Sequence, residues 1–334
     1  MTYDFFKFIK ILLRGASQVM FQNNAWTGAF FILGITAGAA IEGLPLIAIG
    51  AVLGLIVSTI TGYLLKLPKE EGEQGLWGFN GILVGCAFPT FLGSTPLMWS
   101  ALILCAAMTT WLRTGMNNIM NSWKINSLTF PFVFATWIFL LSTHSFDGIW
   151  GEYMSMPSLL KDFSPNISTN LNNLLDDWLK GISQIFLINS WFAGLLFLIG
   201  LYLSSRWAAI WAGIASAIAL AVAVIFKASG IEIANGLYGF SATLTGIALG
   251  CTFYKPNMKS AIWAVLGIIT TVFVQGAMNA LFGPFGIATL TAPFCIITWI
   301  FLLPRLNLDN TISDTGNAGN SPDHSHWHKQ HSKQ

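Results

Sequence analysis

The chain has 334 residues, of which 54% are hydrophobic and only 9% are charged, and its formal net charge is +2. Soluble domains carry about 25% charged residues, so this composition excludes an ordinary soluble fold, and the small net charge suggests no nucleic-acid partner. Apolar stretches recur from Trp26 to Leu303, and many approach the ~20 residues that cross a bilayer. We therefore expect an all-α, polytopic membrane protein.

The first predicted elements along the chain are a less hydrophobic segment and, after it, a series of membrane crossings. Residues 3–22 contain several basic side chains and Gln18, which predicts a half-membrane or re-entrant element rather than a full span. Five crossings are predicted after it, at about 26–42, 44–66, 76–92, 96–114 and 125–142. No cleavable signal peptide is predicted before them.

The chain is predicted to divide into four parts. Residues 1–142 form the first half, and residues 143–168 are predicted to be an extracellular connector. Residues 169–304 form a second half, in which 169–188 corresponds to 3–22. Residues 305–334 are predicted to be a disordered, His-rich cytoplasmic tail, with metal binding as the less favoured alternative.

The two halves repeat one pattern. Residues 129–141 are Thr-Phe-Pro-Phe-Val-Phe-Ala-Thr-Trp-Ile-Phe-Leu-Leu, and residues 291–303 are Thr-Ala-Pro-Phe-Cys-Ile-Ile-Thr-Trp-Ile-Phe-Leu-Leu. Gly75-Leu-Trp-Gly-Phe79 likewise returns as Gly236-Leu-Tyr-Gly-Phe240. Five crossings per half is an odd number, so the second copy is expected to be inverted, with a solute path at the repeat interface. Basic residues before the first span favour cytoplasmic termini.

The repeated motif supplies candidate path residues. A proline inside a membrane helix removes one N–H, so Pro131 and Pro293 are expected to kink their helices and free a carbonyl, beside the hydroxyls of Thr129 and Thr291. A kink satisfied by neighbouring helices is the alternative for one such motif alone.

Further pairs occupy equivalent positions in the two halves. The carboxamides of Gln18 and Gln184 can both donate and accept hydrogen bonds. The apolar pairs Phe79/Leu83 and Phe240/Leu244 are spaced to share a helix face, and Phe21 lies one turn after Gln18. Each of these would alone be ordinary packing or capping. Together they favour a path for a small, planar, neutral solute rich in N–H donors.

Charged groups and cysteines add little to this path. Only Glu42 and Glu232 fall near apolar runs, at predicted loop edges, so no membrane-buried carboxylate is expected and the lumen should carry no counter-charge for ions. No catalytic constellation, cofactor site or metal site is predicted in the spans. The four cysteines lack paired spacing and are expected to be core residues, namely Cys86, Cys105, Cys251 and Cys295.

The chain resembles the urea transporter family. The family signature Leu-Pro-x-x-Thr-x-Pro-Phe corresponds here to Ile125-Asn-Ser-Leu-Thr-Phe-Pro-Phe132 and Ile287-Ala-Thr-Leu-Thr-Ala-Pro-Phe294, each lacking the initial Leu-Pro. The resemblance spans residues 10–304. It implies a homotrimer with one pore per protomer in a cell membrane, and channel-like urea permeation down the gradient.

The resemblance also implies roles for the candidate residues. Gln18 and Gln184 would flank the outer urea positions, and Thr129 and Thr291 would form the central constriction. The apolar slot walls would be Phe21, Phe79, Leu83, Phe240 and Leu244. The residue equivalent to Phe21 is Leu187 rather than an aromatic.

Three other interpretations remain. An ion-coupled carrier of a small amide or amine would require Glu42 or Glu232 to enter the lumen. A channel for ammonia or water usually needs a histidine-lined aromatic gate or an arginine filter, and neither is predicted in the spans. A sensor that uses the His-rich tail has no support beyond that tail.

Overall fold

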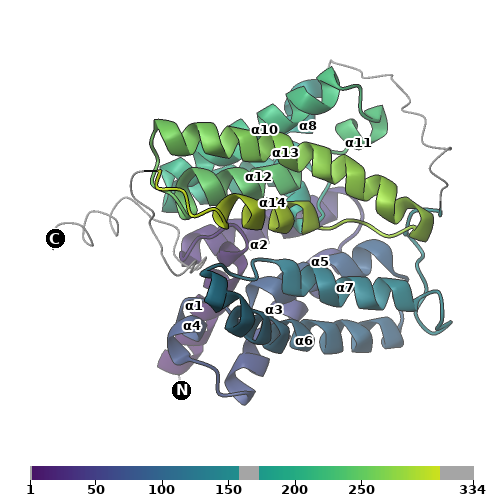
Figure 1. The fold of residues 1–334 in the computed structure, drawn as a ribbon. Coiled ribbons are helices and arrows are strands. Elements are labelled where there is room, and N and C mark those ends of the chain that lie inside the picture. The colour runs from purple at the N-terminus through teal and green to yellow at the C-terminus, as the bar shows by residue number, and fades with distance from the viewer. Residues whose placement is uncertain (1, 158–172, 309–334) are drawn as a thin grey trace.

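The computed structural model describes residues 2–157 and 173–308, and the secondary structure there is entirely helical apart from one isolated bridge residue (Figure 1). The helices of the first half are α1 Thr2–Gln18, α2 Ala25–Ile41, α3 Leu46–Leu64, α4 Lys69–Glu73, α5 Phe79–Phe91, α6 Pro96–Met120 and α7 Phe130–Ser142. Those of the second half are α8 Leu174–Ser183, α9 Trp191–Ser204, α10 Arg206–Ile225, α11 Gly230–Ala234, α12 Gly239–Ile247, α13 Met258–Phe282 and α14 Ala292–Leu302. Long and short helices therefore follow each other in the same order in both halves.

Four helices of the described part are long and apolar enough to cross a membrane. They are α3, α6 continued to Trp123, α10, and α13 continued to Phe285. Helices α8 and α9 together pass the same test but meet at an angle of 73°, so this pair is a broken span or a re-entrant loop. The protein is therefore a multi-pass membrane protein, and the bend falls where the sequence predicts a half-membrane element.

Two predicted crossings are longer than the helices that form. The segments 76–92 and 125–142 contain α5 and α7, which have 13 residues each. At 1.5 Å per residue such a helix extends about 20 Å, less than the ~30 Å hydrocarbon core. Every residue of α5 from Phe79 to Pro89 is buried. Its apolar sequence thus reflects burial in protein, which a hydropathy window does not distinguish from exposure to lipid.

Glycines bring helices of the two halves together. Helix α2 packs against α9 across the interface, where a side chain at Gly34 would lie 2.5 Å from the ring of Phe197. Nearby, the Thr27 hydroxyl donates to the Gly200 carbonyl oxygen at 2.7 Å. Small residues let helix backbones approach closely where lipid provides no hydrophobic driving force. The halves consequently form one packed body.

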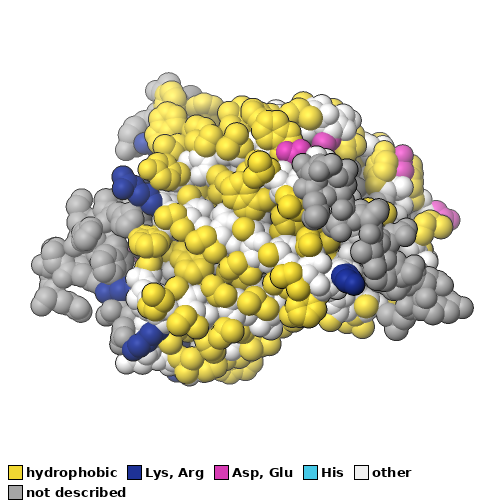
Figure 2. Space-filling model, turned by 90° about the horizontal axis from the view of Figure 1, so that it is seen from above, with side chains coloured by type: hydrophobic (Ala, Val, Ile, Leu, Met, Phe, Trp, Pro, Cys, Tyr) yellow, Lys and Arg dark blue, Asp and Glu magenta, His cyan; other side chains and the backbone are white. Residues whose placement is uncertain are grey.

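The surface is dominated by hydrophobic side chains (Figure 2). On the face shown, basic side chains gather mainly at the end near the C-terminus, and most acidic side chains lie toward the opposite end. An apolar surface between charged ends is typical of a protein that spans a bilayer. Of the predicted connector, residues 143–157 are described. Residues 158–168 and nearly all of the predicted tail lie outside the described residues.

Candidate solute path

The repeated motifs begin helices instead of kinking them. Thr129 is the N-cap of α7 and Pro131 lies in its first turn, and Thr291 and Pro293 have the same places in α14. The N–H groups of the first helical turn have no carbonyl acceptor within the helix, so a proline there removes no helical hydrogen bond and is tolerated. The Ser127 carbonyl accepts an N–H three residues on at 3.0 Å, and its equivalent in the second motif does so at 3.3 Å. The predicted kinks and freed carbonyls are therefore wrong.

The two motif threonines meet at the interface between the halves. The hydroxyl oxygens of Thr129 and Thr291 are 2.7 Å apart and form a hydrogen bond. Thr129 also lies 3.3 Å from the sulfur of Cys295. The threonines are only 3% and 2% exposed. Residues 162 positions apart thus converge at one buried point.

A reciprocal pair of tryptophans holds the motifs against each other. The indole N–H of Trp137 donates to the Ala288 carbonyl at 3.0 Å, and that of Trp299 donates to the Asn126 carbonyl at 2.8 Å. Each helix therefore binds the motif loop of the opposite half through equivalent atoms. A fully buried carbonyl left without a donor costs about 1–3 kcal/mol, and these two are part-buried, so the pair favours this register of the two halves by at most that amount each.

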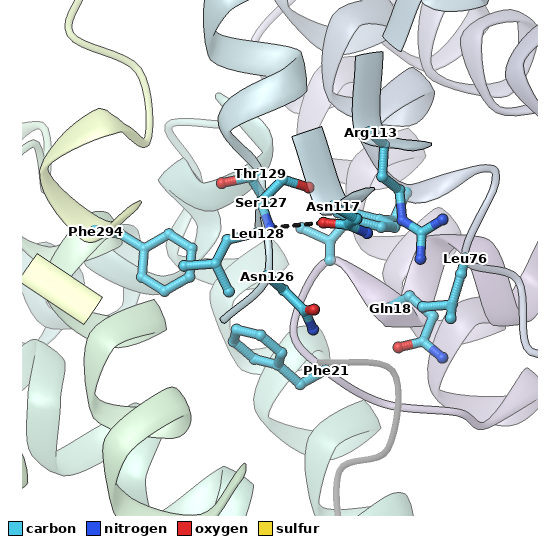
Figure 3. A pocket seen from close by; sticks show the side chains of 12 residues that line it. Gln18, Phe21, Leu76, Arg113, Asn117, Asn126, Ser127, Leu128, Thr129 and Phe294 are labelled. Atoms are coloured by element: carbon cyan, nitrogen blue, oxygen red, sulfur yellow. Dashed lines mark hydrogen bonds between the residues drawn. The ribbon is translucent and has the colours of Figure 1, made fainter. Parts of the chain in front are cut away.

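One cavity, called here the narrow cavity, lies on the first-half side of the threonine pair (Figure 3). Its volume is about 20 Å³, and Gln18, Phe21, Phe79 and Thr129 line it. Phe294 reaches it from the second half, and its ring lies 6.0 Å from that of Phe21 in an edge-to-face arrangement. Three aromatic rings, those of Phe21, Phe79 and Phe294, thus contribute to its wall.

A second cavity, called here the wide cavity, lies on the other side of the pair. Its volume is about 640 Å³, and Thr291, Gln184 and Phe240 line it. Leu187, the residue equivalent to Phe21, also contributes to its wall. Because Thr129 faces the narrow cavity and Thr291 the wide one, the 2.7 Å hydroxyl contact separates the two spaces.

The two glutamines have equivalent surroundings. The side-chain amide of Gln18 donates to the Gln74 carbonyl at 2.8 Å, and that of Gln184 donates to the Asn235 carbonyl at 2.9 Å. Both acceptors immediately precede a glycine with a positive φ. These hydrogen bonds fix the carboxamides at the walls of their respective cavities.

Two equivalent pairs of apolar residues lie in the left-handed backbone region. Leu128 and Leu290 have φ of 53° and 52°, and Phe21 and Leu187 have φ of 62° and 56°. Such a conformation costs of order 1–3 kcal/mol for a residue other than glycine, so it persists only where surrounding structure imposes it. Here all four residues line the cavities.

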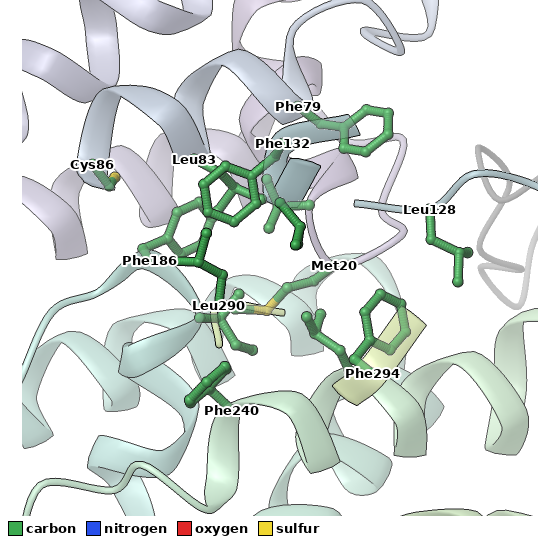
Figure 4. Packing of buried hydrophobic residues seen from close by; sticks show 14 of the residues in the cluster. Met20, Phe79, Leu83, Cys86, Leu128, Phe132, Phe186, Phe240, Leu290 and Phe294 are labelled. Atoms are coloured by element: carbon green, nitrogen blue, oxygen red, sulfur yellow. The ribbon is translucent and has the colours of Figure 1, made fainter. Parts of the chain in front are cut away.

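Two of the predicted slot residues lie behind the cavities. Leu83 and Leu244 are fully buried and line neither space. Figure 4 shows Leu83 beside Phe132, within the apolar packing between the halves. Phe132 and Phe294, the last residues of the two motifs, line the wide and narrow cavities instead. The repetition of this phenylalanine at the end of both motifs is the sequence feature that could have identified both residues as wall residues.

The expectation of an uncharged lumen is wrong. Glu42 and Glu232 line the wide cavity, and Arg113 lines the narrow one. Burial raises the pKa of the Glu42 carboxyl, against the smaller opposing effects of a hydrogen bond from the Asn189 backbone N–H and of the charge of Lys180. Both carboxylates belong to connecting segments, as the cap of α2 and part of α11. The apolar pattern of the sequence therefore indicates that both glutamates lie at loop edges, but it does not indicate that those loops fold over a cavity.

Arg113 is a buried cation that the sequence reasoning missed, although it lies inside the predicted span 96–114. It is 7% exposed, and its guanidinium binds Glu71 at 2.7 Å and lies 5.9 Å from the ring centre of Phe79. The charge of each partner is therefore compensated at the narrow cavity.

The equivalent carboxylate in the second half has neutral partners. Glu232 accepts hydrogen bonds from the Tyr238 hydroxyl at 2.8 Å and from the Asn279 amide at 3.2 Å. The Asn279 oxygen in turn accepts from the Gln275 amide at 2.8 Å, and that amide also donates to Thr289 at 2.6 Å. A polar network thus runs from Glu232 toward the second motif.

Comparison with known proteins identifies this architecture. The family model described as "Urea transporter" matches residues 9–306. Urea transporter 1 of Ovis aries is 27% identical over 302 residues, covering 89% of this chain and 77% of that protein. Urea transporter 1 of Rattus norvegicus is 27% identical over 307 residues with the same coverage, and that of Mus musculus is 26% identical over 303 residues. The chain belongs to the urea transporter family.

Proposed function

We propose that the protein conducts urea down its concentration gradient along the narrow cavity, the threonine pair and the wide cavity. The observation that carries this proposal is the 2.7 Å contact between Thr129 and Thr291, which are equivalent residues of the two halves at the junction of two cavities. Family membership makes the chain a transport protein rather than an enzyme.

The chemistry of the walls suits urea. A solute that gives up about six hydrogen bonds at ~2 kcal/mol each faces a barrier of about 12 kcal/mol in a bare apolar hole, or roughly eight to nine decades in rate. Paired carboxamides and hydroxyls replace part of that hydrogen bonding. The rings of Phe21, Phe79 and Phe240 give flat walls for a planar molecule. Leu83 and Leu244 would support these walls from behind.

Passage requires the threonine pair to exchange partners. Oxygens 2.7 Å apart leave no room for a solute between them, so each hydroxyl must give up the other in favour of urea. A hydroxyl both donates and accepts, which lets it follow the carbonyl and the amide ends of urea in turn. The exchange conserves hydrogen bonds and therefore keeps the barrier low.

Stopped-flow light scattering of urea-driven volume change in proteoliposomes tests this path. We expect the double variant Thr129→Val, Thr291→Val to lose about tenfold to a hundredfold in urea permeability, from ~1–3 kcal/mol of lost hydrogen bonding. The matched control is Thr136→Val, Thr298→Val, because these buried threonines lie in the same helices and line neither cavity. Equal permeabilities in the two double variants would contradict the assigned path.

Assembly and orientation are further parts of the proposal. The path lies within one chain, so each protomer of the homotrimer that the resemblance implies would conduct independently. The distribution of charge in Figure 2 supports cytoplasmic termini in a plasma membrane, with the connector and the wide cavity outside. Tyr153 and Met156 of the connector line that cavity.

An ion-coupled carrier is the second candidate, because two carboxylates line the wide cavity. Such a carrier would accumulate urea when a sodium or proton gradient is imposed. Passive conduction predicts the same urea permeability with and without either gradient.

A further inference from the structure

The two halves differ in charge at one equivalent site. Glu71 and Glu232 each lie four residues before the positive-φ glycine of their half, Gly75 and Gly236. In the first half the Arg113 guanidinium binds Glu71 at 2.7 Å. In the second half Gln275 stands where Arg113 stands in the first, 162 residues later, the same separation as that of the motif threonines. The carboxylate is kept and the guanidinium is missing.

A cavity occupies the region where the guanidinium is missing. The space lined by Arg113 measures about 20 Å³, whereas that lined by Glu232 and Gln275 measures about 640 Å³. No lysine or arginine is among the described residues that line the wide cavity. The nearby Lys180 donates to the Ala234 carbonyl at 3.0 Å.

Acceptors of hydrogen bonds are in excess at this site. Glu232 can only accept, so its contact with Asn279 requires the Asn279 amide nitrogen to face it and the Asn279 oxygen to face Gln275. That arrangement turns the Gln275 nitrogen toward Asn279 and Thr289 and leaves the Gln275 oxygen without a partner among the described residues. Gln275 is 98% buried and lines the cavity. The carboxylate also retains acceptor capacity beyond its two donors.

We propose that the wide cavity binds a guanidinium-type organic cation, held by Glu232 and Gln275 in the place that the Arg113 side chain takes in the first half. Guanidinium is planar, carries only donors, and matches a carboxylate in two-point geometry. It therefore complements a carboxylate and an unpaired amide oxygen. A second carboxylate, that of Glu42, lines the same cavity.

Isothermal titration of the purified full-length chain in detergent tests the site, with guanidinium chloride at low millimolar concentration as the probe and sodium chloride as the blank. We expect saturable binding that Glu232→Gln weakens about tenfold or more, because a charge-assisted hydrogen bond is lost. The control Glu70→Gln makes the same change at an exposed carboxylate outside both cavities and should leave the affinity within about twofold. Absence of saturable binding to the native chain, or equal affinity in Glu232→Gln, overturns the proposal.

A second variant tests the site independently, so that the proposal stays testable if Glu232→Gln does not fold. Gln275→Arg restores the residue of the first half and places a built-in guanidinium beside Glu232. We expect it to abolish binding of the free cation while the chain elutes as a single species of native size. Retained affinity in this variant also overturns the proposal.

A consequence for transport rests on the proposed function as well. Guanidinium present on both sides of proteoliposomes should inhibit urea permeation in the native chain and fail to do so in Gln275→Arg. Calorimetric binding without any urea permeation would reject urea conduction and leave the cation site standing. Urea permeation without calorimetric binding would do the reverse.

Discussion

Two ion pairs in this chain share a geometry and differ in burial, so they form a natural comparison. Arg113 binds Glu71 at 2.7 Å, with side chains 8% and 37% exposed. Lys7 binds Glu73 at 2.6 Å, with side chains 53% and 51% exposed. We predict that removing the basic partner destabilises the protein only at the first pair.

The magnitude follows from desolvation. Breaking a buried ion pair by removing one partner costs about 3–5 kcal/mol, because it leaves an unpaired charge out of water. Glu71 retains more than a third of its exposure, so solvent relieves part of that cost and we expect about 2–4 kcal/mol for Arg113→Gln. The Lys7–Glu73 pair is solvated and screened, so Lys7→Gln should leave stability unchanged within error.

The free energy of unfolding measured by SDS titration in mixed micelles provides the test. The double variant Glu71→Gln, Arg113→Gln should recover most of the loss, since no uncompensated charge then remains. Equal losses for Arg113→Gln and Lys7→Gln would refute the reasoning, as would a double variant no more stable than Arg113→Gln alone.

Two further predictions concern the interface and the helix contacts. Trp137→Phe and Trp299→Phe each remove one indole donor from a carbonyl of the opposite half, so each should lower the free energy of unfolding by a similar ~1–3 kcal/mol. The control Trp26→Phe, at a side chain 74% exposed, should have no effect. Unequal losses for the first two variants would contradict their reciprocal roles. Gly50→Ala would drive a methyl group into a neighbouring backbone carbonyl, so it should lower the free energy of unfolding by ~2 kcal/mol or more. The added methyl group of Gly115→Ala meets open space within its helix, so this variant should be neutral or stabilising by up to ~1 kcal/mol. Thermal unfolding of the two variants tests this difference.

The sequence was sufficient to predict the class of fold, an all-α polytopic membrane protein. The repeated Thr-x-Pro-Phe blocks predicted that Thr129 and Thr291 would occupy equivalent positions, and the structure brings their hydroxyls within 2.7 Å. Each of the two threonines is also the N-cap of its helix, so the same residues begin a helix in the same way in both halves. The four cysteines are buried and free, as expected for core residues.

The geometry of the motif could not be predicted in the same way. A proline within an apolar run fits both an interior kink and the first turn of a helix. The residue before the threonine, Leu128, adopts a positive φ, and the helix begins only after it, at Phe130. Leucine gives no local signal for that conformation, because tertiary packing imposes it. The predicted span 125–142 was therefore too long.

The charged residues that line the cavities were not predicted either. Glu232 and Glu42 lie in connecting segments, and sequence hydropathy does not show whether such a segment faces bulk water or folds over a cavity. Comparison of the halves would have helped. The exchange of Arg113 for Gln275 between otherwise equivalent positions indicates that one carboxylate has lost its cation.

Retained carboxylates and a path for a neutral solute are compatible, because the two lie at different places. A cation attracted to Glu232 in the wide cavity must give up that partner and its remaining water to pass two hydroxyls among aromatic rings. Beyond them, the narrow cavity offers Arg113, whose charge Glu71 already compensates, and so no net attraction. The desolvation cost of a free charge is several kcal/mol even after relaxation, whereas urea on the proposed path would exchange one neutral hydrogen bond for another at the threonine pair. The wide cavity would then bind cations without conducting them.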